Sequence, residues 1–135
     1  MQRLIPFLSF HGNAEEAMNF YAGVFPGAKI ESLIHFEKDE PGDEGKVLNG
    51  VLSFFGHKFM FHDIKTDLEC PAFNWATSFY VECRDDDEFE KVFNGLSQGG
   101  TVMMGPESIL HFKKVAWVTD KYGFPWQPAV KFPQA

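Results

Sequence analysis

The sequence predicts an α+β fold made of two β-α-β-β-β repeats that form a curved mixed sheet with helices on the outside. The main observation is that one constant offset along the chain superimposes Asn13 on Asp85, Glu16 on Glu88 and Gly27 on Gly99. In both halves an apolar, strand-like run precedes this segment and further β-type patterns follow it. Such self-similarity is typical of a duplicated unit.

The first copy begins with a strand over 6–10, followed by a helix. Asn13 is a suitable N-cap, and Glu16 lies three residues later, where a capping box closes. Apolar residues then recur at helical spacing until Gly27 ends the helix. A strand over 29–36, a charged loop over 37–46 and a hairpin of 47–55 and 57–61 complete the copy.

The second copy repeats this order. A strand over 78–82 leads to an N-cap at Asp85 with Glu88 three residues on, and the helix ends at Gly99. We expect strands over 101–104, 113–119 and 124–127, with a loop at 105–107 and a turn at 120–123. Pro128 and Pro133 are expected to interrupt the tail. The prediction is therefore one domain over 1–135, with repeats 1–64 and 74–132 and a linker at 65–73.

Composition limits the classes of partner. The chain has 135 residues, a net charge of −7 and 12 Lys and Arg, which are scattered singly, so the pattern argues against nucleic acid as a partner. No apolar run is long enough to cross a membrane, and the first residues lack a signal-peptide pattern. Cys70 and Cys83 belong to no CxxC motif and are interpreted as reduced thiols. We expect a cytoplasmic protein.

Several segments of the sequence resemble those of a known family. The duplicated order, the phrase of residues 12–21 (GNAEEAMNFY) and the segment 25–28 (FPGA) resemble the vicinal oxygen chelate superfamily, which includes glyoxalases, bleomycin-resistance proteins and extradiol dioxygenases. Residues 99–102 (GGTV) and 117–127 (WVTDKYGFPWQ) are similar to its PhnB-like branch, often labelled demethylubiquinone methyltransferase-like. The resemblance implies the glyoxalase-like fold but no particular reaction.

The resemblance also implies where a metal would be bound. Enzymes of the superfamily hold a divalent metal with His and Glu side chains from the first and last strand of each repeat. These four positions are matched by Pro6, Met60, Ser78 and Gln127. Neither proline nor a thioether suits a hard cation, and a serine and a neutral amide bind one weakly. We therefore expect no metal and no cofactor.

The leading interpretation is a metal-free small-molecule binding protein that forms a homodimer. The family resemblance implies that repeats can be exchanged between chains, and the sequence leaves both a swapped and an unswapped dimer open. Its aromatic-rich composition suits an apolar pocket with a few polar groups on the concave sheet face. The predicted pocket residues share the strand parity of the ligand positions or lie at the rim of that face. They are Pro6, Leu8, Asn49, Met60, His62, Trp75, Ser78, Tyr80, Trp117 and Gln127, with Trp126 as a further rim residue.

An enzyme is the alternative. It is either metal-dependent, with lyase-like or dioxygenase-like chemistry and ligands drawn from His11, His62, Glu82 and Gln127, or it moves a proton through His62 or Tyr80. A methyltransferase is disfavoured. S-adenosylmethionine is commonly held by a glycine-rich turn between a strand and a helix, whereas Gly99-Gly100 follows a helix. The ligand and the biological process are not encoded in any recognisable motif.

Overall fold

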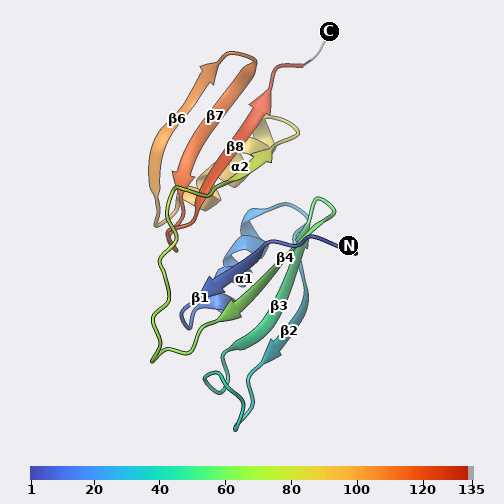
Figure 1. Cartoon of the computed structure of the whole chain (residues 1–135). Helices are drawn as coiled ribbons and strands as arrows, with labels where there is room; N and C mark the ends of the chain where they lie inside the picture. The colour runs from blue at the N-terminus through green and yellow to red at the C-terminus, as the bar shows by residue number, and fades with distance from the viewer. Residues whose placement is uncertain (134–135) are drawn as a thin grey trace. The chain divides into compact units, whose positions relative to one another are not determined.

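The structure is a computed structural model that describes residues 1–133 (Figure 1). The chain divides into two compact units, which we call the first unit (Met1–Pro71) and the second unit (Ala72 onward). The first unit consists of β1 (Phe7–Phe10), α1 (Ala14–Val24), β2 (Lys29–His35), β3 (Val47–Phe54) and β4 (His57–Asp63). The second consists of β5 (Phe79–Glu82), α2 (Asp86–Ser97), β6 (Thr101–Ile109), β7 (Phe112–Thr119) and β8 (Pro125–Lys131). The predicted α+β class and the repeated β-α-β-β-β order are confirmed.

Each unit contains its own four-stranded mixed sheet. The strand orders are β1-β4-β3-β2 and β5-β8-β7-β6. The first and last strands of each unit pair in parallel, and the other neighbours are antiparallel. No closed barrel occurs within residues 1–133. Since β1 lies beside β4, and β5 beside β8, residues far apart in the sequence become neighbours on one face.

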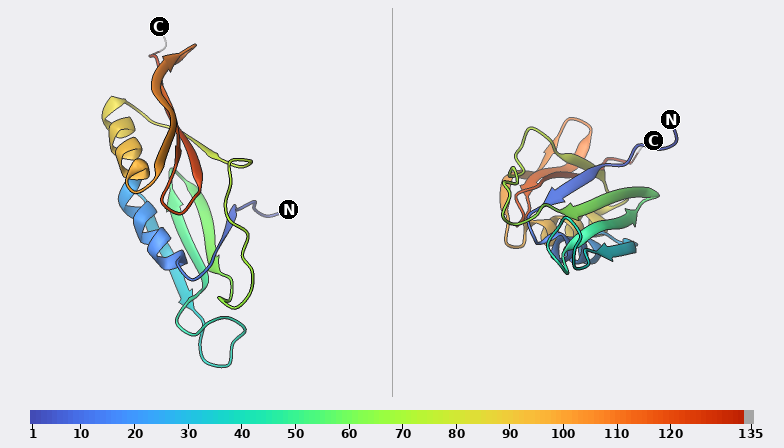
Figure 2. Two further views of the ribbon diagram at one scale, coloured as in Figure 1. Left: turned by 90° about the vertical axis from the view of Figure 1, so that its left-hand side faces the viewer. Right: turned by 60° about the horizontal axis from the view of Figure 1, so that its bottom comes forward.

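One helix covers one face of each sheet, and the core of each unit lies between the two (Figure 2). In the first unit the Tyr21 ring of α1 lies 6.1 Å from the ring of Phe61 on β4, and both are about 1% exposed. In the second unit Phe89 and Val92 of α2 are fully buried. These residues follow the helical spacing seen in the sequence, and burial of such large apolar side chains supplies most of the driving force for folding.

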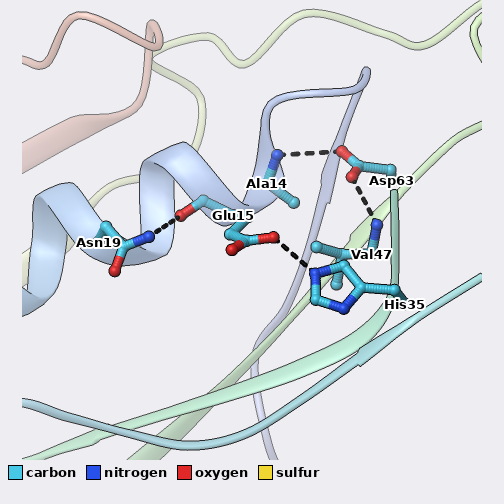
Figure 3. A network of polar contacts seen from close by, with 6 residues as sticks. All are labelled: Ala14, Glu15, Asn19, His35, Val47 and Asp63. Atoms are coloured by element: carbon cyan, nitrogen blue, oxygen red, sulfur yellow. Dashed lines mark hydrogen bonds and ion pairs between the residues drawn. The ribbon is translucent and has the colours of Figure 1, made fainter. Parts of the chain in front are cut away.

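The start of α1 differs from the expected capping box. Asn13 occupies the N-cap position, but its side chain makes no capping hydrogen bond. Instead Asp63, at the end of β4, accepts hydrogen bonds from the backbone N–H groups of Gly12 (2.9 Å), Ala14 (3.0 Å) and Val47 (2.9 Å). Figure 3 shows this carboxylate between the first turn of α1 and the start of β3. A distant residue thus caps the helix, which sequence spacing cannot reveal.

The start of α2 agrees with the prediction. Asp85 Oδ1 accepts from the backbone N–H of Glu88 at 2.9 Å, and Glu88 Oε1 accepts from that of Arg84 at 3.0 Å. The two hydrogen bonds form a capping box, except that Glu88 accepts from the N–H of Arg84 instead of from that of the N-cap residue Asp85.

Two strands of the second unit are longer than predicted. β6 continues through the expected loop at 105–107 to Ile109, with irregular register against β7. β8 continues through Pro128, whose Cα partner on β5 is Val81. The predictions of a loop and of an interruption at Pro128 were therefore wrong. Proline's fixed φ is compatible with an extended strand, at the cost of one ladder hydrogen bond.

Candidate functional site

Each sheet has a second face that its own helix does not cover, which we call the open face. In the first unit, register aligns Phe7 of β1 with Met60 of β4, Met60 with Val51 of β3, and Val51 with Ser32 of β2. Laterally paired residues point to the same side of a sheet. These four residues therefore form the first row, which crosses the open face of the first unit.

The second unit carries an equivalent row. Tyr80 of β5 is the Cα partner of Gln127 on β8, and Trp117 of β7 is the partner of Met104 on β6. Between β7 and β8 the pairs Val115–Ala129 and Val118–Trp126 keep one constant register, which places Gln127 opposite Trp117. We call these four residues, Tyr80, Gln127, Trp117 and Met104, the second row.

In each unit, the observed strand register puts a different residue at one of the expected site positions. The partner of Met60 is Phe7 and not Pro6, whose carbonyl accepts from the Met60 backbone N–H at 2.9 Å. Leu8 pairs with Phe61, is 8% exposed and lies on the helix-covered face. Leu8 is therefore core, because the parallel pairing of β1 with β4 is offset by one residue from the parity assumed.

In the second unit the partner of Gln127 is Tyr80 and not Ser78. Ser78 still lies close, because its Oγ accepts from Gln127 Nε2 at 2.9 Å. Trp126 is 2% exposed, and its Nε1–H donates to Asp120 at 2.8 Å. It belongs to the core and not to a rim.

The remaining candidates lie on the open faces. Asn49 and His62 are two residues from Val51 and Met60 along their strands, so each points to the same side as its row. Trp75 precedes β5, and its ring centroid lies 5.7 Å from that of Trp117. The structure thus groups Asn49, Met60 and His62 in the first unit, and Trp75, Ser78, Tyr80, Trp117 and Gln127 in the second.

His62 has two close neighbours on the open face of the first unit. Its Nε2 lies 2.6 Å from Ser9 Oγ, and its ring contacts Phe7 edge-on at 4.7 Å between centroids. Burial lowers the pKa of His62, with Asp63 acting in the opposite direction. Ser9 and Phe7 were missed by sequence reasoning, because a parallel partner is set by tertiary pairing and leaves no local pattern.

The polar groups of the second unit form a chain. Tyr80 Oη donates to Glu82 Oε1 at 2.7 Å, and Lys131 Nζ lies 3.2 Å from the same oxygen. Burial, followed by the hydrogen bond to Glu82, raises the pKa of Tyr80 to about 12. The hydrogen bond from Tyr80 lowers the pKa of Glu82, and Lys131 adds to this. At neutral pH Tyr80 is therefore a hydrogen-bond donor and not a base.

The donor set does not fit the metal that the fold family implies. With the observed register, the positions on the first and last strands are Phe7, Met60, Tyr80 and Gln127, which offer a ring, a thioether, a neutral phenol and an amide. Hard divalent cations prefer carboxylate oxygens, and zinc prefers thiolate or imidazole. Within residues 1–133 no three His, Cys, Asp or Glu side chains gather in a metal-binding arrangement. His11, a further candidate, lies with its Nε2 3.1 Å from the carbonyl of Thr66.

No helix within the described residues is long and apolar enough to cross a membrane.

Comparison with known proteins gives one family match. Residues 2–129 match the model of the family described as 3-demethylubiquinone-9 3-methyltransferase. The search of curated proteins returned no match.

Solved structures share the fold over nearly the whole chain. A Bacillus cereus protein, described as a 3-demethylubiquinone-9 3-methyltransferase and PhnB protein, is 37% identical with a TM-score of 0.86, covering 96% of this chain and 99% of that one. A Pseudomonas aeruginosa protein is 24% identical with a TM-score of 0.85, covering 97% and 98%. A glyoxalase family protein from Bacillus cereus is 11% identical with a TM-score of 0.71, covering 98% and 96%, and shows the fold alone.

Proposed function

Since the chain belongs to the family described as 3-demethylubiquinone-9 3-methyltransferase, within the vicinal oxygen chelate superfamily, we propose that it binds a small organic molecule and does so without a metal. The observation that carries this proposal is the make-up of the two rows. Phe7 is 50% exposed and Tyr80 is 48% exposed, although each carries a large aromatic ring. Exposed apolar surface beside a few oriented polar groups is typical of ligand sites.

We do not propose a methyltransferase activity for this chain, although the description of its family contains that word. A methyltransferase needs a backbone cradle for S-adenosylmethionine, and Gly99-Gly100 is the only paired glycine in the sequence. A Cβ at Gly100 would lie 2.2 Å from the carbonyl oxygen of Thr119, and Gly99 has φ +75°. Close packing on β7 and the turn after α2 account for both glycines, so they require no ligand.

The proposed assembly is a cytoplasmic homodimer, either with or without exchange of repeats between chains. The support is the resemblance to the superfamily together with apolar side chains on both open faces. A solution mass of twice 15.4 kDa by light scattering is the expected result.

Ligand binding is tested with 8-anilinonaphthalene-1-sulfonate, a fluorescent apolar probe. We expect the native protein to enhance its emission and Met60→Glu to weaken the apparent affinity at least about fivefold, because a charge in the first row must be desolvated by an apolar ligand. Leu68→Glu is the matched control, since Leu68 is 58% exposed, lies outside both rows and receives the same charge. Equal binding by the two variants would contradict the proposal.

Metal independence is tested on protein purified without chelator. We expect far less than one equivalent of metal per chain, and no rise in Tm with zinc, nickel, manganese or magnesium. A ligand that binds the native state must raise Tm in proportion to its concentration and affinity. Stoichiometric metal, or a Tm that climbs with metal concentration, would replace this proposal with a metal-dependent enzyme.

A second candidate function is proton transfer by His62. The 2.6 Å contact with Ser9 favours it, since a hydroxyl beside a neutral imidazole can lose its proton. We expect NMR titration of the His62 ring to give a midpoint below 6.5, the direction that burial imposes. Because the folded pKa is lowered, the contribution of His62 to stability is lost as pH falls below 6.5, where the unfolded chain takes up the proton. A midpoint above 6.5 would remove the basis for a neutral base here.

A further inference from the structure

Ser9 and His62 form a hydroxyl–imidazole pair on the open face of the first unit. They are Cα partners on the parallel strands β1 and β4, and Ser9 Oγ lies 2.6 Å from His62 Nε2. N–H donors usually lie about 2.7–3.2 Å from an oxygen, whereas hydroxyl donors approach to about 2.5 Å. The short distance therefore favours the Ser9 hydroxyl as the donor and Nε2 as the acceptor. In this arrangement the imidazole can remove the hydroxyl proton.

The pair is held in place by its neighbours. Strand pairing fixes the backbones of both residues, and the Phe7 ring packs edge-on against His62 with 4.7 Å between the centroids. β1 is an edge strand, and Cys70 Sγ donates to the carbonyl oxygen of Ser9 at 4.0 Å. Ser9 and His62 nevertheless stay partly exposed. The pair is therefore ordered but not enclosed by the core.

We propose that Ser9 is a nucleophile that takes the acyl group from small esters with an apolar leaving group, with His62 as its general base. Ser9 Oγ forms a bond to the ester carbonyl carbon while its proton passes to His62 Nε2. The bond from that carbon to the leaving oxygen breaks, and the proton moves from Nε2 to the departing alcohol. Water then releases the acyl group as a carboxylic acid, again through His62. This inference rests on the proposed proton transfer by His62 and adds the substrate class.

The surroundings of the pair favour an apolar leaving group. Phe7 is 50% exposed beside His62, and Met60 lies two residues before His62 on the same side of β4. These side chains offer apolar contact next to the base that protonates the leaving oxygen. Burial lowers the pKa of His62, which keeps the imidazole neutral and able to accept a proton at neutral pH.

Asp63 follows His62 in the sequence but does not complete a catalytic triad with it. Adjacent strand residues point to opposite faces, and Asp63 is 4% exposed and accepts from the backbone N–H groups of Ala14 and Val47. In serine proteases, disabling the carboxylate of the triad slows turnover about 10⁴-fold. We therefore expect slow turnover, in which a reactive ester leaves its acyl group on Ser9.

The test treats the native protein with 4-nitrophenyl acetate, whose aromatic leaving group absorbs visible light once it is released. We expect a burst of about one equivalent of 4-nitrophenolate per chain, followed by a slow phase. Peptide mass spectrometry should locate the acetyl group on Ser9. This site is read on the native protein, so it does not depend on how well any variant folds. An unmodified Ser9, with acetyl groups only on lysine or histidine side chains, overturns the proposal.

Three variants assign the roles of the two side chains. Ser9→Ala should abolish the burst, and His62→Gln should slow acetylation of Ser9 at least about hundredfold, the lower end of what a general base supplies. Ser53→Ala is the matched control, because Ser53 lies two residues from Val51 on the same open face. Its hydroxyl donates to Glu31 Oε1 at 2.7 Å and not to an imidazole, so its burst should equal that of the native protein. An unchanged burst in Ser9→Ala would contradict the proposal.

These outcomes are distinct from the tests of the functions proposed above. If Ser9 stays unmodified while the His62 midpoint lies below 6.5, proton transfer by His62 stands without acyl transfer. If 8-anilinonaphthalene-1-sulfonate binding is sensitive to Met60→Glu, small-molecule binding stands as well. An unmodified Ser9 together with a midpoint above 6.5 would remove both the acyl transfer and the proton transfer on which it rests.

Discussion

Replacement of Asp63 by alanine is expected to lower the free energy of unfolding by about 3–5 kcal/mol. The carboxylate accepts from three backbone N–H groups, those of Gly12, Ala14 and Val47, and Asp63 is only 4% exposed. Without it the first turn of α1 and the start of β3 lose a shared acceptor, and each buried donor left unsatisfied costs about 1–3 kcal/mol. Urea unfolding followed by far-UV circular dichroism measures the change.

Two further variants test whether the effect comes from the hydrogen bonds of the Asp63 carboxylate. Asp63→Asn retains one side-chain oxygen, but turns its NH₂ group toward another donor, so we expect a loss smaller than that of alanine. Asp67→Ala is the matched control, because Asp67 is exposed and its side chain forms a 3.5 Å ion pair with Lys65. It should change the free energy of unfolding by no more than about 0.5 kcal/mol. Equal effects of Asp63→Ala and Asp67→Ala would show that the network of Figure 3 does not hold the first unit together.

Asp120→Ala is expected to have the second largest effect, about 2–4 kcal/mol. Asp120 is 3% exposed and accepts from the backbone N–H groups of Tyr122 (2.8 Å) and Phe124 (3.1 Å). It also accepts from Trp126 Nε1 at 2.8 Å, so removing it strands one side-chain donor and two backbone donors. Thermal unfolding monitored by tryptophan fluorescence measures the loss.

An NMR signal also tests whether the loss of stability comes from a lost hydrogen bond. The Trp126 indole N–H signal should move upfield in Asp120→Ala, because its hydrogen bond is lost. Asp120→Asn keeps an acceptor and should preserve more stability than alanine. A normal Tm in Asp120→Ala together with an unchanged Trp126 signal would disprove the role assigned to this carboxylate.

Much of the fold could be predicted from local sequence patterns, because these patterns reflect contacts between residues a few positions apart. The capping box at Asp85 and Glu88 lies within one helical turn, and its sequence spacing is sufficient to place the start of α2. Asn13 has the same pattern, yet Asp63 caps α1 from about fifty positions away. Pro128 lies inside β8, which is a central strand of its sheet. Proline is uncommon there because it cannot donate to the hydrogen-bond ladder, so the sequence predicted that the strand ends before it.

The site could be predicted only in part, because its geometry depends on pairing between distant strands. Strand parity groups Met60 with His62 without knowledge of the partner strand. The match of β1 to β4 is not local, so Leu8 was placed on the wrong face and Phe7 and Ser9 were overlooked. The contact of Trp75 with Trp117 likewise joins a loop to a strand that lies far along the chain.

The rows lie on the side of each sheet away from the helix and the core. A substitution there changes the chemistry of the exposed surface but removes little of the packing that keeps the unit folded. Since the chain carries the scaffold twice, one row can acquire new chemistry without altering the other. If the rows bind the ligand as proposed, the molecule that is bound can change while the buried scaffold stays the same.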